Sequence, residues 1–422
     1  MVNAFYDSYC ILNKVYSEGA YVKQAMASTP IEEKNRAQIT KICYGVLDKD
    51  IFLSDRIKRL CDKNPKLVVR TVLKIAIYNI EFLKKPPYAV TDSAVELLNK
   101  LGKKGVSGFV NAVLRKYLKT TFPDFGNDLH GLSLKYDYPE FAVKKIVDFY
   151  GKERAEKIMG SSSELTGIRF KRGFDGEEYL NNLNVNYLKT PFENFFLAEK
   201  FSRNSDFDNG TYTFQSIGSV AVVYELLNAF DKDKFTAEVL DACAAPGGKS
   251  VLLSEFFGKV YAEEIHSHRV ELIRQYAKRM GSDNVEEEEG DACVLNPSFV
   301  GRFSAVLCDV PCSGYGVLKS NPDIKLHRNE ENIEELTGIQ LGILNNCSKY
   351  VSSGGIMVYS TCSIFREEND GAVVNFLKGN KDFCLVETKP LIPHLKTEYG
   401  VQFLPDECFG AGFYAAVLKK IK

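Results

Sequence analysis

The chain changes its hydrophobic pattern near residue 206. Over residues 1–122 the apolar positions recur every three or four residues, for example from Val68 to Ile80, and this spacing predicts amphipathic helices. Turn-forming residues at 123–127 mark the end of that region. From residue 206 onward, short apolar runs alternate with helical patterns, which is typical of βαβ units around a parallel sheet.

The pattern predicts a multidomain fold with three parts. Residues 1–122 are expected to form an all-α domain, residues 127–205 a small α+β middle region, and residues 206–422 an α/β domain. In the middle region we expect a helix over 139–159 and a strand over 166–170. In the α/β domain we expect strands near 239–242, 260–264, 305–309 and 356–359. The helices expected around them span 250–257, 268–280, 331–350 and 367–377.

The net charge of −1 hides a contrast between the first region and the rest. Residues 1–122 carry 21 Lys and Arg against 11 Asp and Glu, a net charge of +10, so the remaining residues carry −11. A basic block of this kind is expected to bind a polyanion, since phosphate neutralisation dominates nucleic-acid affinity. A solvated lysine-rich helical surface would have the same composition, and charge alone leaves both interpretations open.

The overall composition, 45% hydrophobic and 26% charged, is that of an ordinary globular protein. No apolar run approaches the length of a membrane span and no secretory leader is evident, so we expect a cytoplasmic protein without membrane contact. The 11 cysteines are scattered with no Cys-x-x-Cys pair, and there are only 5 histidines. We therefore expect reduced thiols, and neither a disulfide framework nor a metal site.

A loop rich in small residues connects the strand and helix predicted on either side of it. Residues 241–250 read Asp-Ala-Cys-Ala-Ala-Pro-Gly-Gly-Lys-Ser, which matches neither the GxxxxGKS/T nor the GxGxxG spacing. Small residues let a ligand approach the backbone, and the following helix offers free N–H groups and a positive dipole end. We expect a carboxylate-bearing nucleoside ligand. Glu264, or its neighbour Glu263, would hold the ribose, and Asp291 would lie near the base.

Two cysteines follow predicted strands, at what should be one edge of the sheet. Cys312 lies in the run Asp-Val-Pro-Cys-Ser-Gly at 309–314, and Cys362 lies in Ser-Thr-Cys-Ser at 360–363. A helix expected to begin near Phe365 would assist ionisation of Cys362 through its dipole. A thiolate beside a nucleoside ligand suits addition to C6 of a pyrimidine, which makes C5 able to attack an activated methyl group. Asp309 is placed to hold the N3 and O2 edge of such a base, which must first leave its stack.

Three segments together resemble one enzyme family. These are the loop at 240–249, the segment from Asp309 to Ile324, and residues 360–363 followed by Glu-Glu-Asn at 367–369. In content and order they resemble the S-adenosylmethionine-dependent RNA cytosine-C5 methyltransferases. The N-terminal region looks like the NusB-like domain of the ribosomal small-subunit branch, known as the Sun or Fmu branch. The resemblance implies a Rossmann-like class I methyltransferase domain, S-adenosylmethionine as cofactor, and 16S ribosomal RNA as partner and substrate.

The resemblance also implies a role for each matching residue. Cys362 matches the nucleophile that attacks C6, and Cys312 matches the second cysteine, which helps to release the product. The residues implied in cofactor binding are Cys243, Ala244, Ala245, Pro246, Gly247, Gly248, Lys249, Glu264, Asp291 and Asp309. The chain departs from the family pattern in three places: Val310 stands where alanine is usual, Glu264 stands where aspartate is usual, and no acid precedes the Gly412-Phe413 pair.

Three other functions fit part of the pattern. The same chemistry on transfer RNA is disfavoured by the NusB-like region. A catalytically silent RNA-binding assembly factor is disfavoured because both thiols are present. A small-molecule methyltransferase would not require a basic helical domain. The chain is expected to be a monomer.

Overall fold

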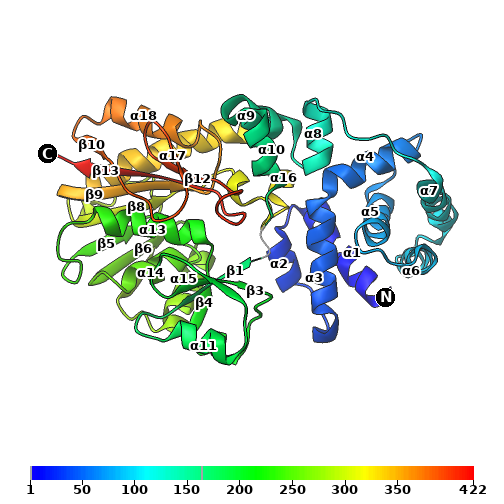
Figure 1. The fold of residues 1–422 in the computed structure, drawn as a ribbon, viewed down its shortest axis with the longest axis horizontal. Coiled ribbons are helices and arrows are strands. Elements are labelled where there is room, and N and C mark those ends of the chain that lie inside the picture. The colour runs from blue at the N-terminus through cyan, green and yellow to red at the C-terminus, as the bar shows by residue number, and fades with distance from the viewer. Residues whose placement is uncertain (1, 163–164) are drawn as a thin grey trace. The chain divides into compact units, whose positions relative to one another are not determined.

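The computed structural model describes residues 2–162 and 165–422 (Figure 1). The chain groups into two compact units. One holds the residues up to Met159 together with Asn321–Asn329, and the other holds Gly160–Ser320 and Glu330–Lys422. Residues 127–159, which the sequence placed in a middle region, thus group with the helical unit. The three-part division itself stays a prediction.

The first unit is helical, as its periodicity predicts. Its elements are α1 (Val2–Glu18), α2 (Val22–Ala27), α3 (Glu33–Asp48), α4 (Asp50–Leu60), α5 (Leu67–Glu81), α6 (Pro87–Lys100), the 3₁₀ turn η1 (Lys104–Val106), α7 (Ser107–Lys119), α8 (Leu129–Tyr136), α9 (Glu140–Tyr150), α10 (Lys152–Gly160) and α16 (Ile324–His327). Helix α5 is buried along most of its length and packs against α1, α3, α4, α6 and α7, so it forms the centre of the core. The single helix expected over 139–159 is two helices, because Gly151 between them adopts a φ of 74°.

A segment from between the two cysteine motifs, Asn321–Asn329, belongs to the helical unit. Asp323 accepts a hydrogen bond from the Val22 backbone N–H at 2.8 Å. Lys325 donates to the carbonyl oxygens of Asp48 and Asp137 at 2.8 and 2.9 Å, and its ammonium group lies 3.8 Å from the Asp137 carboxylate. Hydrophobic periodicity did not predict that residues 321–329 belong to the helical unit. The helix in this segment is short and contains a buried lysine, so it shows no apolar stripe.

The second unit begins with a small antiparallel sheet in the order β2-β3-β1-β4. Its elements are β1 (Leu165–Phe170), α11 (Gly176–Asn182), β2 (Tyr187–Lys189), β3 (Phe195–Glu199), α12 (Ser205–Asp208) and β4 (Tyr212–Phe214). Phe170, Phe196 and Tyr212 lie in its aromatic core. Strand β1 confirms the prediction at 166–170. Strands β2 and β3 were not predicted, because they span only 3 and 5 residues and show no alternation.

The main sheet has the order β11-β12-β13-β9-β8-β5-β6-β7, and β10 also pairs with β13. The parallel strands are β5 (Glu238–Asp241), β6 (Lys259–Glu264), β7 (Val285–Glu289), β8 (Phe303–Asp309) and β9 (Val351–Thr361). The antiparallel pairs involve β10 (Phe383–Val386), β11 (Leu395–Lys396), β12 (Val401–Phe403) and β13 (Phe413–Lys420). The sheet is therefore mixed rather than parallel throughout, because the last part of the chain returns without crossover helices.

Helices cover both faces of the main sheet (Figure 1). One face carries α13 (Ile217–Ala229), α14 (Gly248–Ser254) and α15 (Ser267–Met280), and the other carries α17 (Glu330–Tyr350) and α18 (Asp370–Gly379). Val239 and Ala305 pack on the first face, whereas Leu240 and Val306 pack on the second. Strands buried on both faces read as continuous apolar runs, which is why the sequence predicted them.

The chain order reverses between β5 and β8. Strands β6 and β7 follow on one side of β5, and β8 and β9 lie on the other side. In doubly wound sheets, ligands bind in the crevice at the carboxyl ends of the strands beside such a reversal. Asp241 and Asp309 are the last residues of β5 and β8, so the predicted loop and the first cysteine motif both begin there. Among the described residues, every helix is too short or too polar to span a membrane.

Candidate active site

A cavity of about 270 Å³ opens at the carboxyl ends of the parallel strands. Its wall includes seven of the twelve site residues that the sequence predicted, namely Cys243, Ala245, Glu264, Asp291, Asp309, Cys312 and Cys362. It also includes Ile265, Arg269, Val310, Pro311, Ile339 and Ile343. All of these residues belong to the second unit.

The two predicted thiols are neighbours in this cavity. The sulfur atoms of Cys312 and Cys362 lie 3.1 Å apart, and the Cys362 backbone N–H donates to the Cys312 sulfur at 3.2 Å. Both cysteines are free, since a disulfide bond would bring the sulfurs to about 2.05 Å. Both side chains are half-buried and line the cavity, so a base that enters it meets two sulfur atoms.

The environment of Cys312 favours its protonated form. The hydrogen bond with Cys362 raises the pKa of Cys312 well above the ordinary value, and burial and the charges of Cys362, Glu368 and Asp309 act in the same direction. The helix expected near Phe365 does not begin there, because α18 begins only at Asp370. That prediction was wrong. Side-chain hydrogen bonds hold the intervening residues as turns, so a helix dipole at Cys362 is not supported.

Asp309 is held between a cation and a hydroxyl group. Its Oδ2 pairs with Lys249 Nζ at 2.5 Å, and its Oδ1 accepts a hydrogen bond from Ser360 Oγ at 2.7 Å. Burial opposes the charged form of Lys249, but the Asp309 carboxylate and its hydrogen bond outweigh burial and raise the pKa of Lys249. Asp309 lines the cavity, and Lys249, which does not line it, supplies the cation that pairs with Asp309.

The loop after β5 turns tightly into α14. Gly247 is the N-cap residue and has a φ of 103°, a left-handed conformation that glycine adopts without strain. Ala244 N–H donates to the Glu263 carbonyl oxygen at 3.0 Å, which ties the loop to β6. The predicted loop residues that do not line the cavity are Ala244, Pro246, Gly247, Gly248 and Lys249. These residues shape the turn, begin the helix or, in the case of Lys249, reach Asp309.

Of the two adjacent acids at the end of β6, Glu264 lines the cavity. Its Oε1 accepts a hydrogen bond from Arg269 Nη1 at 3.1 Å, and Arg269 also donates to the Ala245 carbonyl oxygen at 3.3 Å. Glu263 points to the opposite face of the strand, where a Cβ on Gly290 would lie 2.4 Å from its Oε1. Burial, followed by the charges of Glu288 and Asp291, raises the pKa of Glu263 to about 7. The geometry thus favours Glu264 over Glu263 as a ligand of the cavity.

Comparisons with known proteins show the family to which the chain belongs. Residues 226–419 match the family model described as 16S rRNA methyltransferase RsmB/F, and residues 3–119 match that of the NusB family. The probable ribosomal RNA small subunit methyltransferase B of Bacillus subtilis is 32% identical over 404 residues, which cover 88% of this chain and 86% of the relative. The chain belongs to the RsmB/F family of 16S rRNA methyltransferases.

Solved structures share the fold. The crystal structure of PH0851 is similar over 99% of this chain and 98% of its own, with a TM-score of 0.84 and 23% identity. NSun6 from Pyrococcus horikoshii, solved with SFG, covers 67% of this chain and 98% of its own, with a TM-score of 0.57 and 19% identity. As a member of the RsmB/F family, the chain is an RNA methyltransferase that uses S-adenosylmethionine. The cavity fits this cofactor, because it combines the buried Glu264 carboxylate with apolar walls and begins at the loop whose glycine turn leads into α14.

Sequence reasoning missed several residues of the RsmB/F site. Arg269 lies in the first turn of α15, five positions after Glu264, and that proximity to an acid was a readable signal. Ile339 and Ile343 form part of the apolar wall, but their spacing does not distinguish them from core residues. Glu368 is fully buried in turns beside both cysteine loops, and its importance became visible only with the fold.

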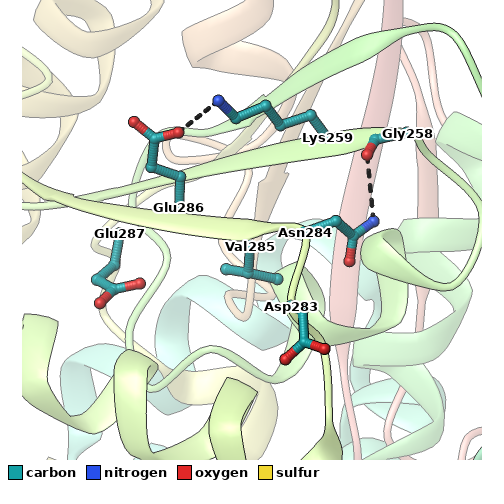
Figure 2. Close-up of a pocket in the computed structure, with 7 residues that line it drawn as sticks. All are labelled: Gly258, Lys259, Asp283, Asn284, Val285, Glu286 and Glu287. Atoms are coloured by element: carbon teal, nitrogen blue, oxygen red, sulfur yellow. Dashed lines mark hydrogen bonds and ion pairs between the residues drawn. The ribbon is translucent and has the colours of Figure 1, made fainter.

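A second depression lies at the outer edge of the main sheet and shares no residue with the cavity (Figure 2). Residues 258–259 and 283–287 line it. Lys259 pairs with Glu286 at 2.5 Å, and Asn284 donates to the Gly258 carbonyl oxygen at 3.4 Å, so two pairs of its lining residues bond to one another. The acidic run of β7 keeps this sheet edge from pairing with other strands. Within the described chain, no group of three or more His, Cys, Asp and Glu residues is placed to hold a metal ion.

Proposed function

We propose that this methyltransferase transfers a methyl group from S-adenosylmethionine to C5 of a specific cytosine in 16S ribosomal RNA, through a covalent bond between Cys362 and C6. The observation that carries the proposal is the 3.1 Å separation of the Cys312 and Cys362 sulfur atoms, in a cavity that Glu264 also lines. A one-thiol methyltransferase would have no need of this pair. The relative in Bacillus subtilis, named as a small subunit methyltransferase, supports ribosomal RNA as the target.

The proposed cycle gives each thiol a task. Cys362 adds as the thiolate to C6 of the cytosine, and the electrons of the C5–C6 double bond make C5 nucleophilic. When bound, S-adenosylmethionine would supply the electrophilic methyl group that C5 takes, with the methyl–sulfur bond breaking as the C5–methyl bond forms and S-adenosylhomocysteine leaving. A base then removes the C5 proton, the C5–H electron pair restores the double bond, and the Cys362 thiolate leaves. Cys312 remains a thiol next to the Cys362 sulfur and supports this release, in keeping with its raised pKa.

Asp309 and Lys249 are proposed to act on the target base. Addition of a thiolate to C6 shifts negative charge toward the N3 and O2 edge of the ring. Negative charge at that edge is favoured by a fixed cation, because preorganised charges need no rearrangement during the reaction. Lys249 is therefore proposed to offset the charge, and Asp309 to hold the base edge and to fix the lysine. The 2.5 Å pair between Asp309 and Lys249, together with the Ser360 hydrogen bond, holds Asp309 in place at the wall with Lys249 beside it.

The helical unit is proposed to bind the RNA substrate. The net charge of +10 on residues 1–122 supports this role, because lysines and arginines neutralise phosphates. Methylation of transfer RNA and a silent assembly role are the alternatives that the experiment below decides. The monomeric state and the cytoplasmic location stay predictions.

Alanine variants of Cys362 and Cys312, with Cys384 as a control, test the covalent cycle. Cys362→Ala should lose methyl transfer by more than about 1,000-fold while it still binds RNA, because a nucleophile has no substitute. Cys312→Ala should accumulate a covalent RNA adduct, seen as a shifted band on a denaturing gel. The exposed Cys384→Ala should behave as wild type. Normal turnover by Cys362→Ala would refute the mechanism, and bisulfite sequencing of total RNA would show whether the methylated cytosine lies in 16S or in transfer RNA.

A further inference from the structure

Glu368 is a buried carboxylate between the two cysteine loops, and 0% of its surface is exposed. Its Oε1 accepts a hydrogen bond from the Ser313 backbone N–H at 2.7 Å, and its Oε2 accepts one from Ser313 Oγ at 2.5 Å. The same Oε2 accepts a hydrogen bond from Ser363 Oγ at 2.5 Å. Ser313 follows Cys312 and Ser363 follows Cys362, so one side chain joins the residues next to both thiols.

Helix α17 supplies a further donor to this carboxylate. Gln340 Nε2 donates to Glu368 Oε1 at 3.1 Å and to the Pro311 carbonyl oxygen at 3.0 Å. A carboxylate has about four acceptor positions, and these donors fill them. A buried polar network that is fully satisfied holds its members in one geometry.

The cysteine loops depend on such bonds for their geometry. Residues 310–314 and 363–365 have no regular secondary structure, so no backbone ladder fixes the two sulfur atoms. Direct contacts between the loops add to the network, since Ser313 Oγ lies 3.1 Å from Ser363 Oγ and Gly316 N–H donates to the Cys362 carbonyl oxygen at 2.9 Å. Glu368 is the group that bonds to both loops and to α17 at once.

Shape alone does not require a charged group at this position. The side-chain partners of Glu368 among the described residues are neutral: two hydroxyls, one backbone N–H and one amide. A buried carboxylate without a cation costs free energy that a glutamine of the same shape would avoid. The charge does act on a thiol. After the hydrogen bond with Cys362 and burial, the charges of Cys362, Glu368 and Asp309 raise the pKa of Cys312.

We propose that Glu368 is a positioning residue, which holds the Cys312 and Cys362 loops so that both sulfur atoms face one bound base. Its charge adds to the Cys362 hydrogen bond and to burial, which come first in raising the pKa of Cys312. The inference rests on the proposed covalent function. Cys362 forms and breaks the bond to the base, and Glu368 acts through the two serines without contact with the base.

Glu368→Gln in the full chain tests the inference without removing the network. Its amide oxygen still accepts from Ser313 N–H and Gln340, and its amide nitrogen faces serine hydroxyls that can rotate to accept. Glu367→Gln is the matched control, because Glu367 is the exposed neighbour. Each variant is measured with S-adenosylmethionine and transcribed 16S ribosomal RNA, and separately without RNA.

Two readouts are needed. In single turnover, Glu368→Gln should transfer the methyl group at least about tenfold more slowly, with the S-adenosylmethionine concentration for half-maximal rate within twofold of wild type. The neutral amide keeps the network but loses its charge-assisted hydrogen bonds, so it holds the loops less firmly, and small displacements of reacting atoms cost large factors in rate. Without RNA, the pH midpoint for alkylation of Cys312 by iodoacetamide, followed by peptide mass spectrometry, should move to lower pH. The direction follows because the variant removes a negative charge that disfavours the thiolate.

Glu367→Gln should leave the rate and the midpoint unchanged. A wild-type transfer rate in Glu368→Gln overturns the inference, and so does an unmoved alkylation midpoint, since a purely structural residue would change stability without moving it. The alkylation test needs neither RNA nor turnover. An active Cys362→Ala variant would therefore refute the covalent cycle on its own, while the effect of Glu368 on Cys312 is read separately.

Discussion

Glu263 and Glu264 are adjacent residues of β6 with side chains on opposite faces of the main sheet. Glu264 faces the cavity and bonds to Arg269, whereas Glu263 is buried under Gly290 with a pKa raised to about 7 by burial and by neighbouring acids. An acid that holds ribose hydroxyls must be ionised and must face the ligand. Glu264 meets the second condition and Glu263 does not.

The two acids therefore form a matched pair for a binding experiment. Glu264→Gln should weaken S-adenosylmethionine binding at least about tenfold, because a hydrogen bond to a charged group is worth roughly 1.5–3 kcal/mol. Glu263→Gln should bind it within twofold of wild type. Isothermal titration calorimetry on both variants measures the dissociation constants. A loss confined to Glu263→Gln would move the ribose assignment to that residue.

At the scale of elements, the short turn η3 (Tyr315–Val317) fits between two loops of the second unit. Gly316 N–H donates to the Cys362 carbonyl oxygen at 2.9 Å, and Gly412 N–H donates to the Gly316 carbonyl oxygen at 2.8 Å. A Cβ on Gly316 would lie 2.3 Å from the Gly412 oxygen and 2.7 Å from the Cys362 oxygen. Backbone atoms cannot move aside as a flexible side chain can, so this turn requires glycine.

Gly316→Ala should therefore displace the Cys362 loop and lower methyl transfer by about 100-fold, the scale expected for a displacement near 1 Å. Gly338→Ala is the control, because Gly338 is exposed in α17 and a Cβ there meets no atom within 4 Å. The control should keep wild-type activity and gain about 0.5–1 kcal/mol in free energy of unfolding, since alanine favours the helix. Activity assays and urea denaturation compare the two. Equal activity of both variants would contradict the proposed fit of η3.

The elements also show why part of the site was predictable. Parallel strands end at one edge of a sheet, so Cys312 and Cys362 could be expected together from their positions after apolar runs. The partners of Glu368 come from three separate parts of the chain, and no local pattern joins Ser313, Gln340 and Glu368. The start of α18 was misplaced for the same reason, because bonds such as that between Thr361 Oγ1 and Asn369 hold the residues before Asp370 as turns.

At the scale of the whole molecule, the chain leaves the second unit after Ser320, only eight residues past Cys312, and re-enters it at Glu330. The intervening segment is anchored in the helical unit by the buried pair of Lys325 and Asp137, whose side chains are 2% and 1% exposed. The motif around Cys312 and the unit proposed to bind RNA are thus joined by a short stretch of chain as well as by the connection after Met159. The stability of the helical unit therefore includes a contribution from residues far along the sequence.

Lys325→Met should destabilise the helical unit at pH 8 by about 3 kcal/mol, the low end for breaking a buried pair. The Asp137 carboxylate loses its nearer cation and keeps only Lys49, whose ammonium group lies 4.0 Å away. Burial raises the pKa of Asp137 to about 6 from 3.8, with Lys325 opposing that rise. A carboxyl group with a raised folded pKa binds more protons when folded, so stability falls as pH rises from about 4 to 6. Removal of Lys325 raises the pKa of Asp137 further, so the decrease in free energy of unfolding should extend to higher pH. At pH 4 the carboxyl group is protonated in the folded state, and the substitution should lower the free energy of unfolding by less than at pH 8.

The exposed Lys58→Met is the control and should match wild type at both values of pH. Because the chain contains no tryptophan, far-ultraviolet circular dichroism follows unfolding in urea. Hydrogen exchange of peptides from α3, α4 and α8 assigns the change to the helical unit. Equal destabilisation of Lys325→Met at pH 4 and pH 8 would mean that the two backbone carbonyl bonds of Lys325, rather than its charge, anchor the segment. If Lys325→Met has the stability of wild type at pH 4 and at pH 8, this lysine does not anchor the segment.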